Sequence, residues 1–223
     1  MPDRIEPRIV LASRSPRRRE LLELLVSPAS IRVCPPRDAE EAGFEGLHDL
    51  PTIEARSLEI ARAKADDVRS QLAGEATSGE DLLSVVVAAD TEVVVTDAVG
   101  RLHVLGQPPE DDTWKGVVRR WFREYYAGRS HLALTGLSVS VGGRRVERLV
   151  RTEVTFREDV DGRLDWYIST GEPRGKAGGY AIQGAGSLFV TQVKGSLSNV
   201  VGLPLEALVE IFEELGIHTA GSV

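Results

Sequence analysis

The run LLSVVVAADTEVVV, residues 82–95, constrains the fold more than any other stretch of this 223-residue chain. Its β-branched and apolar residues predict a buried strand, in which the apolar run stops at Asp90 and Thr91 and then resumes. A carboxylate inside a buried strand is costly unless it is paired with a cation or bound to a metal. Asp90 is therefore a candidate functional residue. The alternative is that Asp90 lies in a turn between two separate strands.

A second strand signal, RIVLA at residues 8–12, is followed directly by the arginine-rich segment SRSPRRR. Ser15 can cap a helix and Pro16 suits the first helical position, so the pattern predicts a strand, a tight turn and a helix. Free N–H groups at such a helix start favour an anion, and arginine adds bidentate phosphate donors. The cluster fits either polymeric nucleic acid or one phosphate-bearing small molecule.

The overall charge favours the small molecule. The chain has a formal net charge of −7, whereas domains that bind nucleic acid polymers usually carry a basic face. Cys34 is the only cysteine, so no intramolecular disulfide can form, and no Cys/His cluster supports a zinc site. The N-terminus lacks the apolar stretch of a signal peptide, and no run approaches the roughly 20 apolar residues of a membrane span. We expect a cytoplasmic protein that binds neither membrane nor polymeric nucleic acid.

The remaining pattern predicts helices and strands that alternate loosely. Helices are expected at residues 53–72, 112–128 and 205–217, with a short one ending near Gly171; strands are expected at 131–156, turning at Gly142-Gly143, and at 187–193. This order indicates an α/β class with a mixed sheet.

A glycine-rich segment, GEPRGKAGGYAIQG at residues 171–184, would let the backbone approach a ligand closely. Its polar residues are Glu172, Lys176, Tyr180 and Gln183. The amide of Gln183 can donate and accept hydrogen bonds at once, which suits the edge of a nucleobase. Together with the arginines and Asp90, this segment indicates phosphoryl chemistry on a nucleotide; a surface loop with ordinary polar residues is the alternative.

Four segments in this order resemble the Maf family of nucleoside triphosphate pyrophosphatases: LASRSPRRRELL, AADTEVVV, GEPRGKAGGYAIQGAGSLFV and VKGSLSNVVGLPLEAL. The resemblance spans nearly the whole chain and implies a single Maf-like domain over residues 1–223. The implied fold is related to that of inosine triphosphatases, with a mixed sheet, flanking helices and two lobes around a cleft, often as a homodimer. The implied reaction is hydrolysis of a nucleoside triphosphate to the monophosphate and pyrophosphate.

The resemblance also implies roles for individual residues. Asp90 matches the catalytic carboxylate, a proton acceptor, with Lys64 and Arg18 as further catalytic residues. Asp90 and Glu41 would hold a divalent cation, Mg²⁺ or Mn²⁺. Gln183 in AIQG resembles the branch that acts on dTTP and UTP. The residues expected to bind substrate or set its choice are Ser13, Arg17, Thr91, Lys176 and Gln183.

Two positions depart from the family pattern. Gln107 stands where a lysine is frequent, and Gly175 stands where many members have an aspartate. Two alternatives stay open beside the dTTP/UTP-type enzyme, the first of them because of these changes. One is a nucleotide-binding regulator of cell division without turnover, and the other is a pyrophosphatase for non-standard purine nucleotides.

Overall fold

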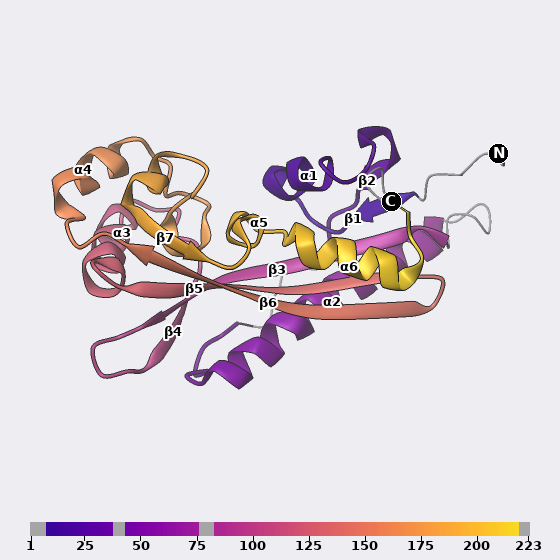
Figure 1. The fold of residues 1–223 in the computed structure, drawn as a ribbon, viewed down its shortest axis with the longest axis horizontal. Helices are drawn as coiled ribbons and strands as arrows, with labels where there is room; N and C mark the ends of the chain where they lie inside the picture. The colour runs from indigo at the N-terminus through magenta and orange to yellow at the C-terminus, as the bar shows by residue number, and fades with distance from the viewer. Residues whose placement is uncertain (1–7, 38–42, 76–82, 219–223) are drawn as a thin grey trace.

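A seven-stranded mixed sheet forms the centre of the computed structural model, which describes residues 8–37, 43–75 and 83–218 (Figure 1). The strand order is β2-β1-β3-β5-β6-β7, and β4 pairs with β3. The pairs β1–β2 and β1–β3 are parallel, and the others are antiparallel. The strands are β1 (Ile9–Leu11), β2 (Ile31–Val33), β3 (Val85–Thr96), β4 (Leu102–Leu105), β5 (Ser130–Val141), β6 (Arg144–Phe156) and β7 (Val190–Lys194).

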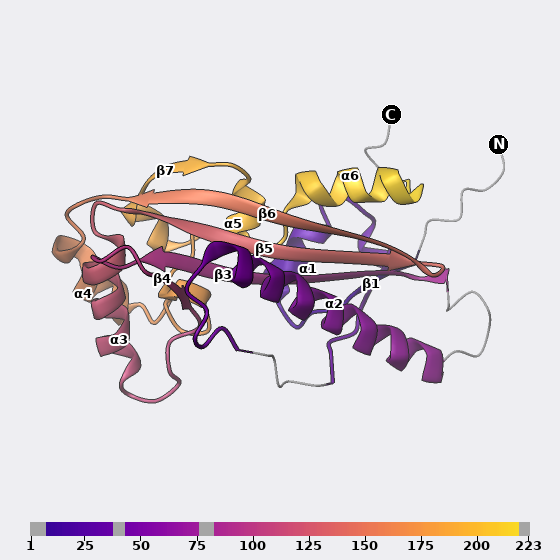
Figure 2. The same ribbon diagram turned by 90° about the horizontal axis from the view of Figure 1, so that it is seen from below.

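Helices cover both faces of this sheet. The long helix α2 lies on one face, and α5 and α6 lie on the opposite face (Figure 2). Helix α1 lies near β1 at one end of the molecule, whereas α3 and α4 lie at the other end. The helices are α1 (Pro16–Leu22), α2 (Leu50–Glu75), α3 (Trp114–Trp121, continued by a π-helical turn at Phe122–Tyr126), α4 (Asp161–Ser169), α5 (Leu197–Val201) and α6 (Leu205–Leu215). None of the described helices is both long and apolar enough to span a membrane.

On the face of the sheet away from α2, strand β3 joins two hydrophobic cores. Val85 and Val87 pack with α1 and α6 in one core, and Val93 and Val95 pack in the other core with the aromatic side chains of α3, α4 and β6. These residues alternate along one face of the strand, as a pleated strand requires. The two cores give two lobes, so the predicted α/β class and its mixed sheet are confirmed.

The structure also corrects three sequence predictions. Strand β3 runs unbroken from Val85 to Thr96, so the alternative of a turn at Asp90 is wrong. The strand expected at 187–193 begins only at Val190, because residues Ala185–Phe189 form a 3₁₀ helix. The helix expected at 112–128 is α-helical only over Trp114–Trp121, since its last turn widens to π-helical geometry around the bulky Phe122 and Tyr126.

His131 makes the aromatic core sensitive to acid. Its Nε2 lies 2.8 Å from the hydroxyl of Tyr180, its ring packs against Tyr126 and Phe156, and it is 3% exposed. Burial lowers the pKa of His131 from 6.5 to about 3, because the charged imidazolium is disfavoured there. The stability that the neutral ring contributes is therefore complete above pH 6.5 and is lost as the pH falls towards 3.

We predict that His131→Phe removes part of this acid sensitivity. Below pH 6.5 the free energy of unfolding of the wild type should fall relative to that of His131→Phe, by up to about 1.4 kcal/mol per pH unit. The unpaired Tyr180 hydroxyl in the variant adds only a constant offset. Urea unfolding at several pH values measures the difference, and parallel pH profiles for the two proteins would contradict the prediction.

Candidate active site

The candidate site lies where one edge of β3 has no neighbouring strand. Residues 85–87 of β3 pair with β1, and residues 93–96 pair with β4 on the same edge. Between them, residues 88–92 pair only with β5 among the described strands. Side chains from both faces of β3 can therefore reach one cavity at this open edge. That cavity has a volume of about 900 Å³, and Asp90, Thr91 and Glu92 line it.

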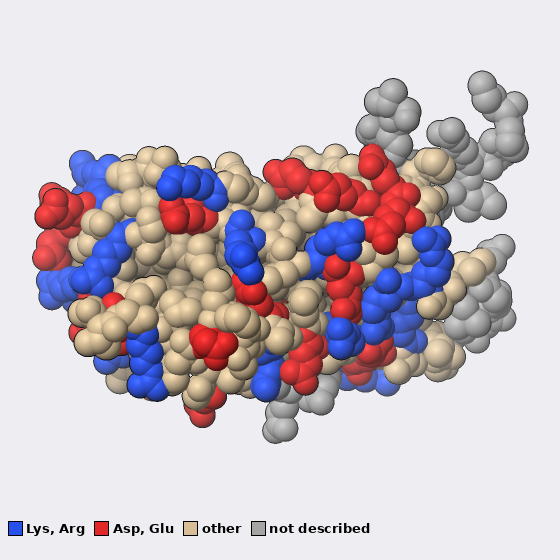
Figure 3. Space-filling view, turned by 60° about the horizontal axis from the view of Figure 1, so that its bottom comes forward, with Lys and Arg blue, Asp and Glu red and all other residues tan. Residues whose placement is uncertain are grey.

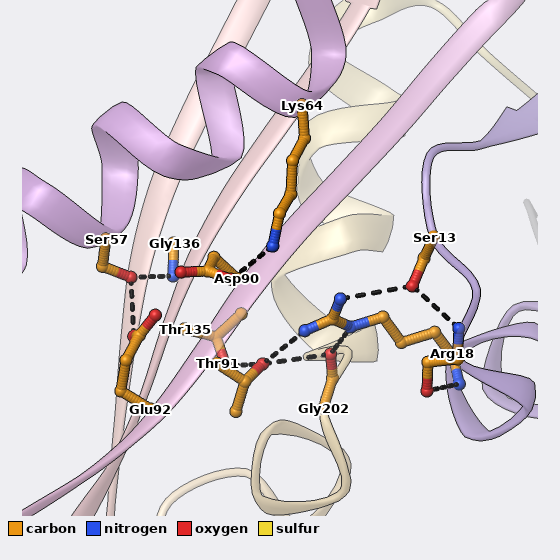
Figure 4. Close-up of polar contacts among 11 residues, drawn as sticks. Ser13, Arg18, Ser57, Lys64, Asp90, Thr91, Glu92, Thr135, Gly136 and Gly202 are labelled. Atoms are coloured by element: carbon orange, nitrogen blue, oxygen red, sulfur yellow. Dashed lines mark hydrogen bonds and ion pairs between the residues drawn. The ribbon is translucent and has the colours of Figure 1, made fainter. Parts of the chain in front are cut away.

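Arg18 is fixed at this edge by three hydrogen bonds (Figure 4). Its Nε donates to the carbonyl oxygen of Gly202 at 2.8 Å, and its terminal nitrogens donate to Thr91 Oγ1 at 3.1 Å and Ser13 Oγ at 3.3 Å. The capping prediction for α1 is confirmed, because Ser15 Oγ accepts from the backbone N–H of Arg18. The sequence thus places the guanidinium through a short strand, a capped turn and the first turn of a helix.

The arginine cluster divides in two. Arg14, Arg17 and Arg18 line the cavity, whereas Arg19 faces away and forms an ion pair with Glu23 at 2.8 Å. Three guanidinium groups on one cavity suit a ligand with several negative charges, such as a polyphosphate.

The opposite face of β3 carries two carboxylates beneath α2. Asp90 and Glu92 are two residues apart, so both point to the face that α2 covers. Lys64 of α2 forms an ion pair with Asp90, with Nζ 2.6 Å from Oδ1. Ser57 lies about two turns before Lys64 on the same face of α2, and its Oγ donates to Glu92 Oε2 at 2.9 Å.

Gly136 brings α2 close enough to the sheet for these contacts. It lies opposite Asp90 on β5, and its backbone N–H donates to Ser57 Oγ at 2.9 Å. A Cβ atom at Gly136 would lie 2.5 Å from the carbonyl oxygen of Ser57, so a side chain there would push the helix away. Since Ser57 Oγ accepts this hydrogen bond, its own proton is directed to Glu92.

The two carboxylates differ in their protonation. Burial raises the pKa of Glu92 well above its ordinary value, and the adjacent Asp90 raises it further. Burial alone would also raise the pKa of Asp90, but the hydrogen bond with Glu92 and the positive charges of Lys64 and Arg18 hold it below its ordinary value. Asp90 is therefore the ionised member of the pair.

The order of the segments and the site they build agree with one known family. The Maf-like protein model matches residues 8–215, which is nearly all of the chain. The chain belongs to the Maf-like protein family. Its relatives include proteins named dTTP/UTP pyrophosphatase from Anaeromyxobacter dehalogenans (strain 2CP-C), Pyrococcus horikoshii and Myxococcus xanthus. Their identities to this chain are 40%, 38% and 40%, covering 94%, 91% and 94% of this chain and 95%, 94% and 93% of theirs.

Most of the residues that the Maf resemblance singles out meet in the one cavity. Its walls include Ser13, Arg17, Arg18, Lys64, Asp90 and Thr91. The two departures from the family pattern, Gln107 and Gly175, also line it. Glu41, the expected second cation ligand, lies outside the described residues.

Lys176 and Gln183 do not line this cavity. Gln183 is exposed. Lys176 lies near the site, since burial and then the charge of Arg17 lower its pKa. Two other polar residues of the glycine-rich segment have structural partners. Glu172 accepts hydrogen bonds from the backbone N–H groups of Ala185 and Gly186, and the Tyr180 hydroxyl contacts His131.

The sequence analysis missed Glu92 and its partner Ser57. The signal for Glu92 was present, because a second acidic residue two positions after Asp90 in a strand must share its face. Ser57 had no such signal, since its role depends on how α2 crosses β5 at Gly136. Phe44 adds an apolar side chain to the wall of the cavity, which His48 and His103 also line.

The cavity of this Maf-like protein fits a hard divalent cation. Its negatively charged donors are carboxylate oxygens, which Mg²⁺ and Mn²⁺ prefer. No group of three or more His, Cys, Asp or Glu side chains that could hold a metal occurs within residues 8–37, 43–75 and 83–218. Such a donor set suits Mg²⁺, which is usually held by one or two carboxylates together with substrate phosphates.

Proposed function

We propose that this Maf-like protein is a nucleoside triphosphate pyrophosphatase that prefers dTTP and UTP. The observation that carries the proposal is the cavity at the open edge of β3, which three arginines and Lys64 line together with the buried Asp90. The cations match a triphosphate, and the carboxylate can act on the water that attacks it. The relatives named dTTP/UTP pyrophosphatase support the same reaction and substrates.

In the proposed reaction, a water oxygen attacks the α-phosphorus of the nucleotide. The bond between this phosphorus and the oxygen that bridges to the β-phosphate breaks, and pyrophosphate leaves. Asp90 orients the water and accepts its proton, for which an ionised carboxylate is required. Arg18 and Lys64 stabilise the negative charge that develops on the phosphates, and Arg17 and Ser13 complete the phosphate-binding wall.

A divalent cation, Mg²⁺ or Mn²⁺, would be held by Asp90 and by Glu41. Bound there, it would neutralise phosphate charge and polarise the reacting phosphoryl group. The side chains of the protein itself position the phosphates and stabilise the developing charge. The hydrogen bonds from Arg18 to Gly202 and Thr91 keep its guanidinium in place before the substrate arrives, so little reorganisation is needed during the reaction.

Base preference is proposed to depend on Gln183, with Arg17 and Thr91. The Gln183 amide offers one donor and one acceptor, which match the carbonyl and N–H edge shared by thymine and uracil. Cytosine presents an amino group and a bare ring nitrogen instead, so at least one hydrogen bond is lost. Gln183 is exposed, so this discrimination requires that the bound base covers it; a polar mismatch then costs about 1–3 kcal/mol, or roughly 10- to 100-fold in kcat/KM.

A panel of nucleoside triphosphates with pyrophosphate detection tests the proposal. We expect kcat/KM for dTTP and UTP to exceed the values for CTP, GTP and ATP by roughly 10- to 100-fold. Gln183→Glu should reduce this preference, whereas the control Gln192→Glu, which makes the same change on exposed β7, should keep it. Equal kcat/KM for all bases would contradict the base assignment but not the reaction.

The same panel decides between the proposal and its two alternatives. Gln107 and Gly175 face the cavity, so their departures from the family pattern could remove contacts needed for turnover. Nucleotide binding, measured by calorimetry on the same triphosphates, without pyrophosphate release would favour the regulator without turnover. Faster hydrolysis of the triphosphates of inosine and xanthosine than of dTTP would indicate an enzyme for non-standard purine nucleotides.

The proposal also covers the location of the protein, its oligomeric state and its expected lack of nucleic-acid binding. We infer a cytoplasmic homodimer that does not bind polymeric nucleic acid. In support, the net charge is −7, and acidic side chains lie beside the basic ones that gather toward the right of the face in Figure 3. Sedimentation of the purified chain, alone and with duplex DNA, tests both the dimer and the expected lack of binding.

A further inference from the structure

We propose that Glu92 is a ligand of the divalent cation, paired with Asp90. The structure shows a second acidic side chain inside the cavity, 5% exposed, with one carboxylate oxygen, Oε1, that receives no hydrogen bond from a donor among the described residues. This cation site serves the proposed reaction and in that sense rests on it, but its existence can be measured without turnover.

The two carboxylates are held side by side by the strand that carries them. Asp90 and Glu92 occupy alternate positions of β3, on the face beneath α2 and at the open edge of the strand (Figure 4). Each carboxylate interacts with the other. Because β3 is paired with β5 at both positions, the backbone cannot move the two groups apart.

The positive charges near the pair act mainly on Asp90. Lys64 forms its ion pair with Asp90. Arg18 donates hydrogen bonds to Thr91 and Gly202, and the Thr91 side chain lies on the other face of β3. Among the described residues no ion pair to Glu92 occurs; Ser57 donates a hydrogen bond to it, and the charges of Asp90 and Lys64 act on it. A cation bound between two buried carboxylates allows both to be ionised at once, which burial and their mutual repulsion otherwise oppose.

Ser57 orients Glu92 for this role. The Ser57 hydroxyl accepts from the backbone N–H of Gly136 and donates to Glu92 Oε2, so its orientation is fixed from both sides. This hydrogen bond occupies Oε2 and leaves Oε1 available. In metal sites a ligating carboxylate is typically oriented by a hydrogen bond from a residue that does not itself touch the metal. Ser57 has this position, and we regard it as a positioning residue.

Direct binding of Mn²⁺ tests the proposal. Free Mn²⁺ is measured by electron paramagnetic resonance during titration of the full chain, once without nucleotide and once with a non-hydrolysable dTTP analogue. We expect Glu92→Gln to weaken Mn²⁺ affinity by about 10-fold or more, since even the loss of an outer-shell partner costs about 10- to 100-fold. Ser57→Ala should weaken it by about 10-fold. The matched control Glu153→Gln removes a carboxylate that pairs with Lys194 at the surface, and it should bind Mn²⁺ as the wild type does.

Two results would overturn the proposal: no Mn²⁺ binding by the wild type in either condition, or equal affinities for the wild type and Glu92→Gln. Thermal unfolding in chelator shows whether each variant is folded, and a folded Glu92→Gln should lose the stabilisation that Mn²⁺ gives the wild type. Pyrophosphate release is scored separately. A wild type that binds Mn²⁺ through Glu92 but hydrolyses no nucleotide would refute the proposed function alone. Hydrolysis with unchanged Mn²⁺ binding in Glu92→Gln would refute this inference alone.

Discussion

Asp90→Asn is expected to lower kcat/KM for dTTP by at least about 10³-fold while the protein stays folded. Asparagine keeps the size of the side chain but has neither the charge that binds a cation nor the basicity that accepts a proton from water. It also leaves Lys64 without the carboxylate that it contacts at 2.6 Å. Pyrophosphate release at saturating cation measures the effect, and circular dichroism measures the fold.

A matched aspartate separates this effect from the loss of an ion pair. Asp66 lies on α2, as Lys64 does, and pairs with Arg145 outside the cavity, so Asp66→Asn removes a more exposed aspartate–cation pair. We expect Asp66→Asn to retain wild-type turnover. If Asp90→Asn retained activity within a few-fold of the wild type at saturating cation, Asp90 would not be the catalytic carboxylate.

Chelation is the second change with a large expected effect. Excess EDTA should reduce pyrophosphate release to the uncatalysed background, and added Mg²⁺ or Mn²⁺ should restore it. The physical reason is that a triphosphate next to two buried carboxylates needs more neutralisation than the arginines and Lys64 provide. EDTA already saturated with Mg²⁺ is the control for effects of the chelator itself. Undiminished hydrolysis in excess free EDTA would show that the reaction needs no divalent cation.

Local patterns predicted the parts of the fold that local interactions determine. The capped start of α1 at Ser15 and the strand through residue 90 are both present, because a hydroxyl before Pro16 and a run of β-branched residues act within a few positions. The hairpin between β5 and β6 turns at Gly142-Gly143 as predicted, and both glycines have positive φ angles.

What the sequence left undetermined depends on contacts between distant segments. Lys64 reaches Asp90 only because α2 crosses β5 at Gly136, and no pattern within α2 reports that crossing. Gly202 accepts from Arg18 although the two residues are far apart in the chain, and nothing in either segment indicates the contact. The prediction for residues 187–193 failed for a related reason. Glu172 binds the backbone of Ala185 and Gly186, which favours a 3₁₀ turn over an extended chain.

The interruption in the pairing of β3 also determines how the molecule can respond to a ligand. The cleft interrupts only one edge of the strand, and β3, β5 and β6 continue beneath it from one hydrophobic core to the other. Within the described residues, continuous strands rather than a flexible connector therefore join the two lobes, and residues 43–48 and 104–107 border the opening. The same continuity couples the two cores in folding, since neither can lose its strands without exposing the apolar residues of the other.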